Sequence, residues 1–471
     1  MKRTSRPLNG PGRRAPLAVR LRDGLRDIVG SAARSSPARL ALLVFTSMIL
    51  LVTVLLELPI SSASGQRTPL VDALFTAMSA VCVTGLVTVE TATHWSTFGL
   101  VVLMFAMKVG GLGVLTLASL LGLSVSRHMG LAQKIITASE TKAEKLAEVG
   151  GVLRTIVITS TAFELLTFLA ITPNLWLRSH DWGKALFNGA FYSISAFNNA
   201  GFVPEHAGVE QYVADPWFSI PVALSVFVGS LGFPAILVVV RSWQHPKNWT
   251  LHAKLTLTTS GILFIVGFVG ILAMEWSNPA TLGPHSLGVK IMASGFASVM
   301  PRSGGLATLD VGHFHQETWL LMDALMFIGG GSGSTGGGIK VTTFALLVLS
   351  IIAEARGDRD VEVFNRRIPQ ETIRQAIAVL VVSAVVIFVA TWMMIRLTGL
   401  SLDRTIFEVL SAYGTVGLST GITHTLPEAA KYVLIVCMYA GRVGPMTLGA
   451  ALALRQRTKV VRLPAERPIV G

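Results

Sequence analysis

Four short segments of the chain have residue types that could bind a dehydrated cation through backbone oxygen atoms. Each contains a triplet ending in glycine: Val83-Thr84-Gly85, Asn199-Ala200-Gly201, Ser303-Gly304-Gly305 and Thr415-Val416-Gly417. Carbonyl oxygens that replace the water around a cation must turn inward, and glycine tolerates the backbone angles that this requires. The triplets therefore predict a cation-selecting filter made of backbone.

The triplets belong to a longer internal repeat with a period of about 110 residues. The copies span Leu74–Leu86, Ala190–Phe202, Ser294–Leu306 and Ile406–Leu418. Three copies have Phe ten residues and Ser six residues before the glycine, whereas the third copy has Gly295 and Val299 there. A single glycine of this kind would more simply indicate close helix packing. Four copies in register favour one structural unit repeated around a ring.

The composition indicates a membrane protein, because 51% of the residues are hydrophobic, only 14% are charged and 45 are glycine. Eight apolar stretches are long enough to cross a hydrocarbon core of about 30 Å. They lie near residues 40–60, 98–123, 152–172, 216–241, 255–274, 317–352, 373–397 and 430–454. The repeat segments, at 69–87, 184–203, 286–306 and 404–419, are too short to cross. We expect each to form a re-entrant half-helix followed by extended backbone.

Basic residues predict the orientation of these spans. Lys and Arg concentrate in the first 39 residues, in the loops 125–154, 241–254 and 354–374, and in the tail 455–467. The positive-inside rule places all of these in the cytoplasm, including both termini, in a cell membrane. The net charge of +13 is explained by these flanks and does not require a nucleic-acid partner. The basic N-terminal arm has no apolar core of a cleavable signal peptide.

A glycine-rich run interrupts the sixth apolar stretch. It consists of Gly329, Gly330, Gly331, Ser332, Gly333, Ser334, Thr335, Gly336, Gly337 and Gly338, and Lys340 follows shortly after it. So many glycines make a continuous helix implausible. The residues around Lys340 do not match a phosphate-binding P-loop. Apolar flanks on both sides favour a mobile barrier within the membrane, and a featureless flexible linker is the alternative.

Several charged residues lie inside the predicted spans, where charge is costly. Arg442, midway along the last span, is expected to face the pore, with a purely structural role tying carbonyl groups as the alternative. Lys108 and Glu164 could form an ion pair between helices, or Lys108 could line a cavity. Arg302 is expected to brace the third filter segment, or else to be an exposed charge at the outer mouth. Asp323 could attract cations or form a helix-end hydrogen bond.

The two cysteines, Cys82 and Cys437, lie in apolar surroundings and indicate neither a disulfide framework nor a zinc site. The sequence shows neither paired carboxylates nor a nucleophile and base cluster that would indicate an enzyme. The fourth triplet matches the first three residues of the TVGYG potassium-channel filter. Because each copy has only one loose triplet, we expect fewer coordination sites and weaker selectivity against sodium than in a potassium channel.

The four triplets, the interrupted sixth span and Arg442 together resemble the Trk/Ktr/HKT superfamily of cation transporters, over residues 40 to 455. The number of spans makes the chain more similar to the KtrB-type subunit than to the longer TrkH type. The resemblance implies an all-α membrane protein with four helix, pore-helix, filter, helix units around one pore. Their bounds here are 40–124, 150–243, 254–353 and 370–455, between an arm at 1–39 and a tail at 456–471.

The resemblance also implies the function. Potassium would bind at Gly85, Gly201, Gly305 and Gly417, since glycine in all four copies accompanies potassium transport. The run 329–338 with Arg442 would form the gate. A homodimer would sit on a cytoplasmic ring of RCK-type subunits, and nucleotide would act only through that partner. Sodium dependence is left open. The rival is an alternating-access secondary transporter, although such proteins show two related halves rather than four quarters.

Overall fold

The computed structural model describes residues 37–113 and 144–454, and this part of the chain is mostly helical. In chain order its α-helices are α2 (Pro37–Glu57), α3 (Leu70–Cys82), α4 (Thr91–His94), α5 (Thr97–Gly111), α8 (Glu144–Ser179), α9 (Trp182–Phe197), α10 (Pro216–Leu231), α11 (Phe233–Ser242), α12 (Leu251–Glu275), α13 (Leu287–Val299), α14 (Gln316–Phe327), α15 (Val341–Arg356), α16 (Gln370–Thr398), α17 (Leu402–Tyr413) and α18 (Glu428–Leu454). A small antiparallel hairpin of β1 (Glu362–Val363) and β2 (Arg366–Arg367) joins α15 to α16.

Three parts of the sequence prediction fall mainly on residues outside the described ranges. These are the basic N-terminal arm 1–39, the loop 125–154 and the tail 456–471. The orientation inferred from their charges therefore stays a prediction.

Four short helices, α3, α9, α13 and α17, occupy the predicted repeat segments, and non-helical backbone follows each of them. They contain 13, 16, 13 and 12 residues. At about 1.5 Å per residue they are shorter than a hydrocarbon core of about 30 Å. Local sequence determines where such a helix begins: the Asp181 carboxylate caps α9 by accepting from the amides of Gly183 and Lys184.

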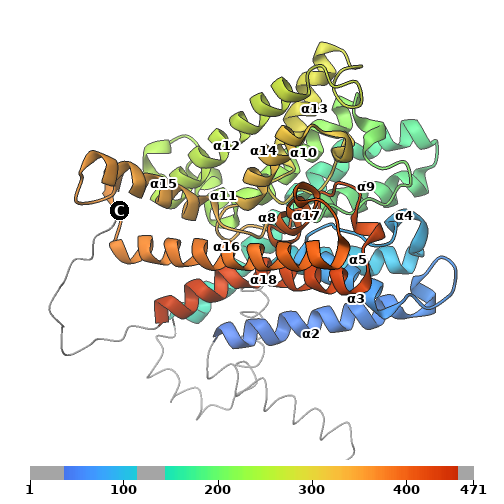
Figure 1. The fold of residues 1–471 in the computed structure, drawn as a ribbon, viewed down its shortest axis with the longest axis horizontal. Helices are drawn as coiled ribbons and strands as arrows, with labels where there is room; N and C mark the ends of the chain where they lie inside the picture. The colour runs from blue at the N-terminus through green and yellow to red at the C-terminus, as the bar shows by residue number, and fades with distance from the viewer. Residues whose placement is uncertain (1–36, 114–143, 455–471) are drawn as a thin grey trace, which may run out of the picture.

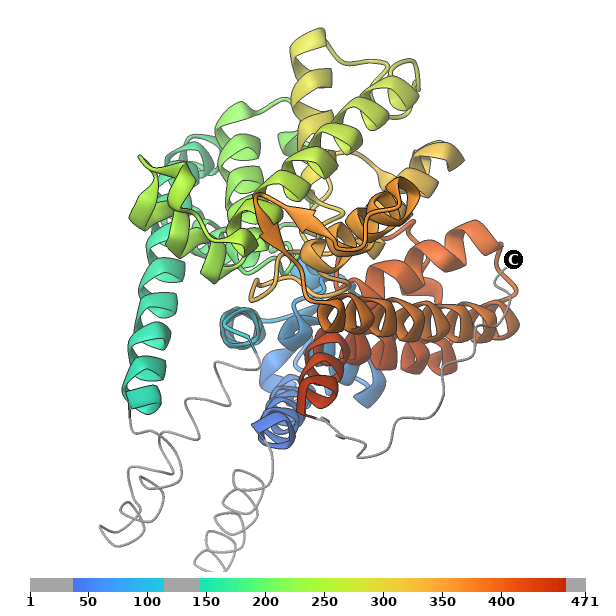
Figure 2. The same ribbon diagram turned by 90° about the vertical axis from the view of Figure 1, so that its left-hand side faces the viewer.

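Within the described residues, three helices are long and apolar enough to cross a membrane: α12, α16 and the part of α8 from Arg154 to Ser179. The pair α10 and α11 passes the same test only as a bent unit. The long helices α2, α16 and α18 run roughly parallel in Figure 1, and Figure 2 views the blue α2 and the cyan α5 nearly along their axes. The full set of eight spans remains a prediction.

The stretch 216–241, predicted as one span, is broken into two helices in the structure. The helix bends by 104° between α10 and α11, at Gly232. Gly232 has a φ of 92°, and a Cβ at this position would lie 2.6 Å from the carbonyl oxygen of Ser332. The amide of Phe233 donates to the carbonyl of Gly333 at 3.1 Å. The break therefore makes room for the glycine-rich run, a distant contact that hydropathy does not reveal.

The helices pack in a closed cycle. The long helix before each short helix packs against it, in the pairs α2 and α3, α8 and α9, α12 and α13, and α16 and α17. A later helix then packs on the next short helix: α5 on α9, α10 on α13, α14 on α17, and α18 back on α3. An ion pair of 2.7 Å between Lys431 and Asp72 fastens this last contact.

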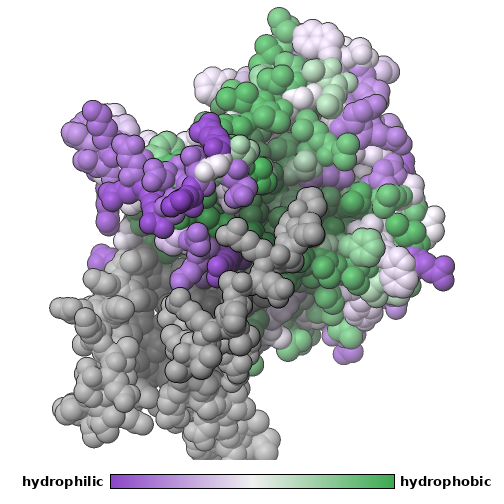
Figure 3. All heavy atoms as spheres, turned by 60° about the vertical axis from the view of Figure 1, so that its left-hand side comes forward, coloured by the Kyte–Doolittle hydropathy of each residue, from purple (hydrophilic) through white to green (hydrophobic). Residues whose placement is uncertain are grey.

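The outer surface suits a lipid environment. Large apolar side chains such as Leu166 on α8 and Phe388 and Trp392 on α16 are exposed. On the face shown in Figure 3, hydrophobic residues form a broad area between hydrophilic regions. Exposed apolar surface on this scale marks a contact with membrane or protein rather than with water.

Glycines allow three helices to cross the ends of the short helices at backbone contact. A Cβ at Gly110 would lie 2.1 Å from the carbonyl oxygen of Val81, and a Cβ at Gly229 would lie 2.1 Å from that of Phe197. At Gly441 the corresponding distance to the Tyr413 oxygen is 1.7 Å. Each of these carbonyls belongs to the residue four positions before the glycine of a triplet. The crossings therefore fix where the first, second and fourth triplets begin.

Replacing Gly441 with alanine should destabilise the protein, because the new methyl group would meet a backbone carbonyl that cannot move independently. Overpacking of this kind typically costs about 1–3 kcal/mol. The matched control is Gly444→Ala. Gly444 lies on the same helix, and a Cβ there would have nothing within 4 Å. Thermal unfolding of the detergent-solubilised protein should show a lower midpoint for Gly441→Ala only. Equal midpoints for the two variants would contradict the crossing geometry.

Candidate functional site

The four triplets adopt one backbone conformation. Their first residues all have left-handed φ angles, which are 58° at Val83, 58° at Asn199, 68° at Ser303 and 49° at Thr415. Their glycines also have positive φ angles, of 95° at Gly85, 72° at Gly201, 68° at Gly305 and 96° at Gly417. A non-glycine residue in this region costs roughly 1–2 kcal/mol. Contacts with the surrounding structure must hold these residues in place.

The serine six residues before the glycine holds the triplet in three of the copies. The amide of the middle residue donates to the carbonyl of that serine, at 2.7 Å from Thr84 to Ser79 and at 2.8 Å from Val416 to Ser411. The hydroxyls of Ser79 and Ser411 also accept from the amides of Gly85 (2.9 Å) and Gly417 (3.1 Å).

The second and third copies vary this arrangement. The amide of Ala200 donates to the Ser195 carbonyl at 2.8 Å, but the Ser195 hydroxyl donates to the Phe202 carbonyl at 2.9 Å. The third copy has Val299 in place of serine, and the Gly304 amide donates instead to Met300 at 2.8 Å. The third copy therefore has no serine hydroxyl at this position, whereas the other three copies have one.

The four glycines meet in a closed ring. A Cβ on Gly85 would lie 3.0 Å from the Cα of Gly201, and one on Gly201 would lie 3.0 Å from the Cα of Gly305. A Cβ on Gly305 would lie 3.4 Å from the Cα of Gly417, and one on Gly417 would lie 3.0 Å from the Cα of Gly85. Segments separated by more than 100 residues thus come into backbone contact in chain order.

Carbonyl oxygens of the middle residues stand beside the neighbouring glycines. The Ala200 oxygen would be 2.6 Å from a Cβ on Gly85, the Val416 oxygen 2.5 Å from one on Gly305, and the Thr84 oxygen 2.1 Å from one on Gly417. No larger residue fits at these glycines without moving backbone. Carbonyl oxygens gathered around a common centre provide the ligands that hard monovalent cations accept.

The glycine-rich run contacts three of the four triplets. A Cβ on Gly336 would lie 2.8 Å from the Ser303 hydroxyl, and one on Gly337 would lie 2.4 Å from the Thr415 hydroxyl. The Asn199 amide, oriented to satisfy its hydrogen bonds, donates to the Thr335 hydroxyl at 3.1 Å. The run is non-helical between α14 and α15, as the sequence predicts.

Hydrogen bonds fasten the run on several sides, so it is not a featureless linker. The Gly331 amide donates to the Ser230 carbonyl at 2.7 Å, and the Gly338 amide donates to the Gly441 carbonyl at 3.2 Å. The Lys340 ammonium group donates to the Gly336 carbonyl within the run at 2.7 Å. At its ends, Ile328 and Ile339 form a parallel bridge.

Arg442 is buried and ties the run to the helices. Its guanidinium donates to the carbonyl of Thr335 in the run, and to the carbonyl of Gly110 on α5 at 2.6 Å. One side chain on α18 thus links the run to the first unit of the packing cycle. The contact with carbonyl groups that was the alternative role for Arg442 is present, and one of these carbonyls belongs to the run.

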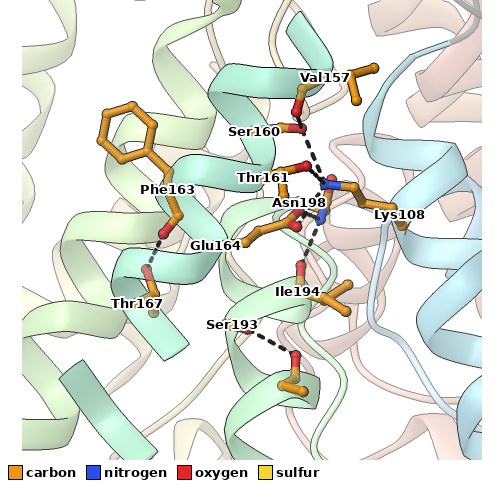
Figure 4. A network of polar contacts seen from close by, with 11 residues as sticks. Lys108, Val157, Ser160, Thr161, Phe163, Glu164, Thr167, Ser193, Ile194 and Asn198 are labelled. Carbon is orange, nitrogen blue, oxygen red and sulfur yellow. Dashed lines mark hydrogen bonds and ion pairs between the residues drawn. The ribbon is translucent and has the colours of Figure 1, made fainter. Parts of the chain in front are cut away.

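Lys108 and Glu164 form the ion pair that the sequence left as one of two options (Figure 4). The Lys108 ammonium group on α5 lies 2.6 Å from the Glu164 carboxylate on α8, and it also donates to the Ser160 hydroxyl at 3.1 Å. Glu164 in turn accepts from the side-chain amide of Asn198 at 2.7 Å. Because Asn198 directly precedes the second triplet, the pair supports the backbone at that triplet.

Arg302 is buried, so the alternative of an exposed charge at the outer mouth is wrong. Its guanidinium donates to the Ser260 carbonyl on α12 at 3.1 Å and stacks over the Phe227 ring at 5.0 Å from the centroid. Asp323 is also buried, and its Oδ1 has no hydrogen-bond partner among the described residues. It lies within α14 rather than at a helix end.

Sequence reasoning missed two carboxylates next to the triplets, of which Glu408 is buried and Glu205 is half-buried. Glu408, on α17, accepts from the amide of Thr420 at 3.2 Å and from the hydroxyl of Thr423 at 3.1 Å. Glu205, just after the second triplet, accepts from the hydroxyls of Tyr192 (2.9 Å) and Tyr212 (2.8 Å). An acidic residue within an apolar repeat segment, as at Glu408, was the available signal.

Comparison with known proteins identifies the family. A model described as "TrkH: Cation transport protein" matches residues 36–458. The chain belongs to the TrkH family.

Two TrkH-family relatives are similar over nearly their whole lengths. "Ktr system potassium uptake protein B" of Vibrio alginolyticus is 35% identical over 450 residues, covering 95% of this chain and 97% of the relative. The protein of the same name from Bacillus subtilis (strain 168) is 35% identical over 437 residues, covering 92% and 97%. The solved structure of the potassium transporter TrkH from Vibrio parahaemolyticus has the same fold, with a TM-score of 0.67, 19% identity and coverage of 88% and 84%.

Membership of the TrkH family makes this chain a membrane protein whose relatives are cation transporters rather than enzymes. The exposed apolar side chains on the long helices therefore face lipid or partner protein. The resemblance inferred from the triplets and the glycine-rich run is confirmed at the level of the family.

Removing one partner of the Lys108 and Glu164 pair should destabilise the protein more than removing both charges. Lys108→Met leaves a buried carboxylate without its opposite charge, which should lower the free energy of unfolding by about 3 kcal/mol. This value is the low end for a buried pair, because the Lys108 side chain is 23% exposed. The double variant Lys108→Met with Glu164→Gln should recover most of this loss. The measurement is the thermal midpoint of the three purified proteins in one detergent. A double variant as unstable as the single one would exclude a pairing role.

Proposed function

We propose that this protein takes up potassium through a channel-like pore formed by four units, at residues 40–124, 150–243, 254–353 and 370–455. The closed ring of Gly85, Gly201, Gly305 and Gly417 carries this proposal. The cyclic packing of the helices supports it, because each short helix is held between its own unit and the preceding one. In this arrangement eight spans surround the pore, and both termini are cytoplasmic.

The twelve residues of the four triplets would form the selectivity filter, with potassium bound at the level of the glycines. The left-handed first residues and the positive φ of each glycine support this, because such angles would turn successive carbonyl groups toward a common centre. Because each unit contributes a single triplet, the ion would exchange its water shell at fewer sites than in a potassium channel. Selectivity against sodium would then be weaker. Both curated relatives are named as potassium uptake proteins, which supports potassium as the main permeant ion.

The run Gly329–Gly338 would act as the gate, together with Lys340 and Arg442. It contacts the first residues of three triplets, so it would lie directly under the filter in the path of the ion. Arg442 adds a buried positive charge and a hydrogen bond to the run, and both would oppose the passage of a cation. Opening would require the run to leave the Thr415 and Ser303 hydroxyls and to release Arg442.

Regulation would come from a separate cytoplasmic ring of RCK-type subunits that bind nucleotide, with this chain as a homodimer on the ring. The relatives' names place them in a "Ktr system", which supports a multi-component assembly. The loop between α15 and α16, with the β1 and β2 hairpin and the exposed Arg366 and Arg367, would offer a polar docking surface. Any effect of sodium would come from its role as a second permeant ion or as a coupling ion.

The second candidate is an alternating-access secondary transporter, which one observation favours. The break between α10 and α11 at Gly232, beside the interruption of α14 and α15, resembles the broken helices of such proteins. However, the packing cycle passes through four short helices of similar size rather than two related halves. The channel-like mechanism therefore has the stronger support.

Exchanging Gly85 for serine should lower the selectivity for potassium over sodium. The new Cβ would lie 2.6 Å from the Ala200 carbonyl oxygen, so a filter carbonyl would have to move. Gly65→Ser is the matched control, because Gly65 has a similar positive φ of 71° but nothing within 4 Å. The measurement is uptake of each ion by a potassium-uptake-deficient bacterium that expresses each variant, with and without an RCK partner. Unchanged selectivity in Gly85→Ser, or an equal loss in Gly65→Ser, would argue against the filter.

Deleting Gly329–Gly338 should make transport leaky when no regulatory partner is present. The deletion joins Ile328 to Ile339, which already pair in the structure, so the helices on either side can keep their places. Arg442→Gln should have a smaller effect in the same direction, because it removes one hydrogen bond to the run. Arg442→Lys keeps the positive charge but cannot bridge the carbonyls of Thr335 and Gly110. It therefore separates the effect of the charge from the effect of the hydrogen bonds. Rubidium uptake into proteoliposomes provides the measurement, and wild-type flux in both the deletion and Arg442→Gln would exclude a gate.

A further inference from the structure

The third copy of the repeat borders a cavity, and the proposed function gives this cavity no role. The cavity has a volume of about 580 Å³ and lies between α10, α12 and α13. Leu224 and Phe227 line it from α10, Phe268 lines it from α12, and Ile291, Gly295 and Val299 line it from α13. Apolar side chains dominate this lining. The volume is in the range of pockets that bind small molecules, which is roughly 300–1,000 Å³.

The departures of the third copy from the repeat account for the cavity. Phe75, Phe191 and Phe407 are fully buried at the position that Gly295 occupies in α13. A Cβ on Gly295 would meet only the Phe268 ring, at 4.0 Å. A buried phenylalanine typically covers about 150–250 Å² of surface. Its absence therefore leaves unfilled space at this one place in the ring of short helices.

The surroundings of the cavity indicate what fills it. Ile220 and Leu224 on α10 and Leu287 and Ile291 on α13 are between 45% and 62% exposed, in a chain that lies in a membrane. Exposed tryptophans mark one end of the same face: Trp217 at the start of α10 and Trp276 directly after α12. Tryptophan is enriched where the hydrocarbon meets the headgroups. The cavity therefore opens onto lipid chains.

A basic residue lies at this tryptophan-marked end. The Lys290 ammonium group lies 4.6 Å from the Trp276 ring centroid and donates to the Trp276 carbonyl at 2.8 Å. Lys290 is on α13, two residues after the cavity-lining Gly288. An apolar cavity with a cation at its headgroup end matches the two parts of an anionic phospholipid.

We propose that the cavity between α10, α12 and α13 is a binding site for one acyl chain of a membrane phospholipid, with an anionic headgroup near Lys290. A linear alkyl chain would supply the apolar contacts that phenylalanine makes in the other three copies.

The lipid would contact the structure behind the third triplet. Phe227 lines the cavity and also faces the Arg302 guanidinium at 5.0 Å. The Val299 carbonyl, at another cavity-lining residue, accepts from the Arg302 amide at 3.3 Å. Arg302 directly precedes Ser303, the first residue of the third triplet. The bound chain would therefore stabilise the one triplet whose copy has valine in place of the serine.

The test uses photo-crosslinking of the full-length protein in phosphatidylglycerol nanodiscs that contain a small share of the same lipid with a diazirine in its acyl chain. Peptide mapping should find labels concentrated on residues of α10 and α13 that line the cavity, above the level on the exposed face of α16 around Phe388. Gly295→Phe restores the repeat pattern and should remove most of the cavity label. Leu166→Phe, on the exposed face of α8, is the control and should leave it unchanged.

Leu224→Trp fills the cavity from the opposite wall. It is used in place of Gly295→Phe if Gly295→Phe does not elute as a single species in size-exclusion chromatography. Labelling of the cavity at the level of the α16 face, or labelling unchanged by either filling variant, would overturn the proposal. Crosslinks between two chains at Leu224 or Ile291 would also overturn it, because a second copy would then cover the face. None of these readouts depends on ion transport, so the result is independent of the proposed function.

Discussion

Backbone contact among four glycines is the constraint on which the rest of the structure depends. Gly85, Gly201, Gly305 and Gly417 approach so closely that no side chain fits between neighbouring triplets. Such a ring can form only if four short helices end at the same level and point toward one centre. The helix crossings at Gly110, Gly229 and Gly441, the serine contacts and the left-handed residues all serve this alignment.

Three buried or half-buried basic residues near the ring are bound to carbonyl groups of the neighbouring backbone or to an opposite charge. Arg442 and Arg302 donate to main-chain carbonyls, whereas Lys108 is neutralised by Glu164. An unpaired charge at membrane depth costs several kcal/mol, so these contacts are a condition for keeping the residues there. Together they connect α5, α8, α12 and α18 to the triplets and to the glycine-rich run.

The sequence predicts those features that arise from local composition. The triplets, the ends of the short helices and the interruption after Phe327 follow from glycine and from apolar length, and the structure has them where the residues indicate. The break at Gly232 could not be predicted, because it depends on a contact with Ser332, far along the chain. The networks around Glu408 and Glu205 use partners that are close in sequence, but apolar length and glycine content do not reveal them. The roles of the triplets and the run in conduction and gating remain predictions.

The ion pair between Lys431 and Asp72 has a consequence for how the protein is made. Its two residues are 359 positions apart, and it joins the last long helix to the first short one. During synthesis α3 enters the membrane long before α18 exists, so its Asp72 carboxylate begins without this partner. Chain segments far apart in sequence are costly to bring together early in folding. Closure of the ring must therefore be a late step in biogenesis, and a truncated chain would leave α3 without its final neighbour.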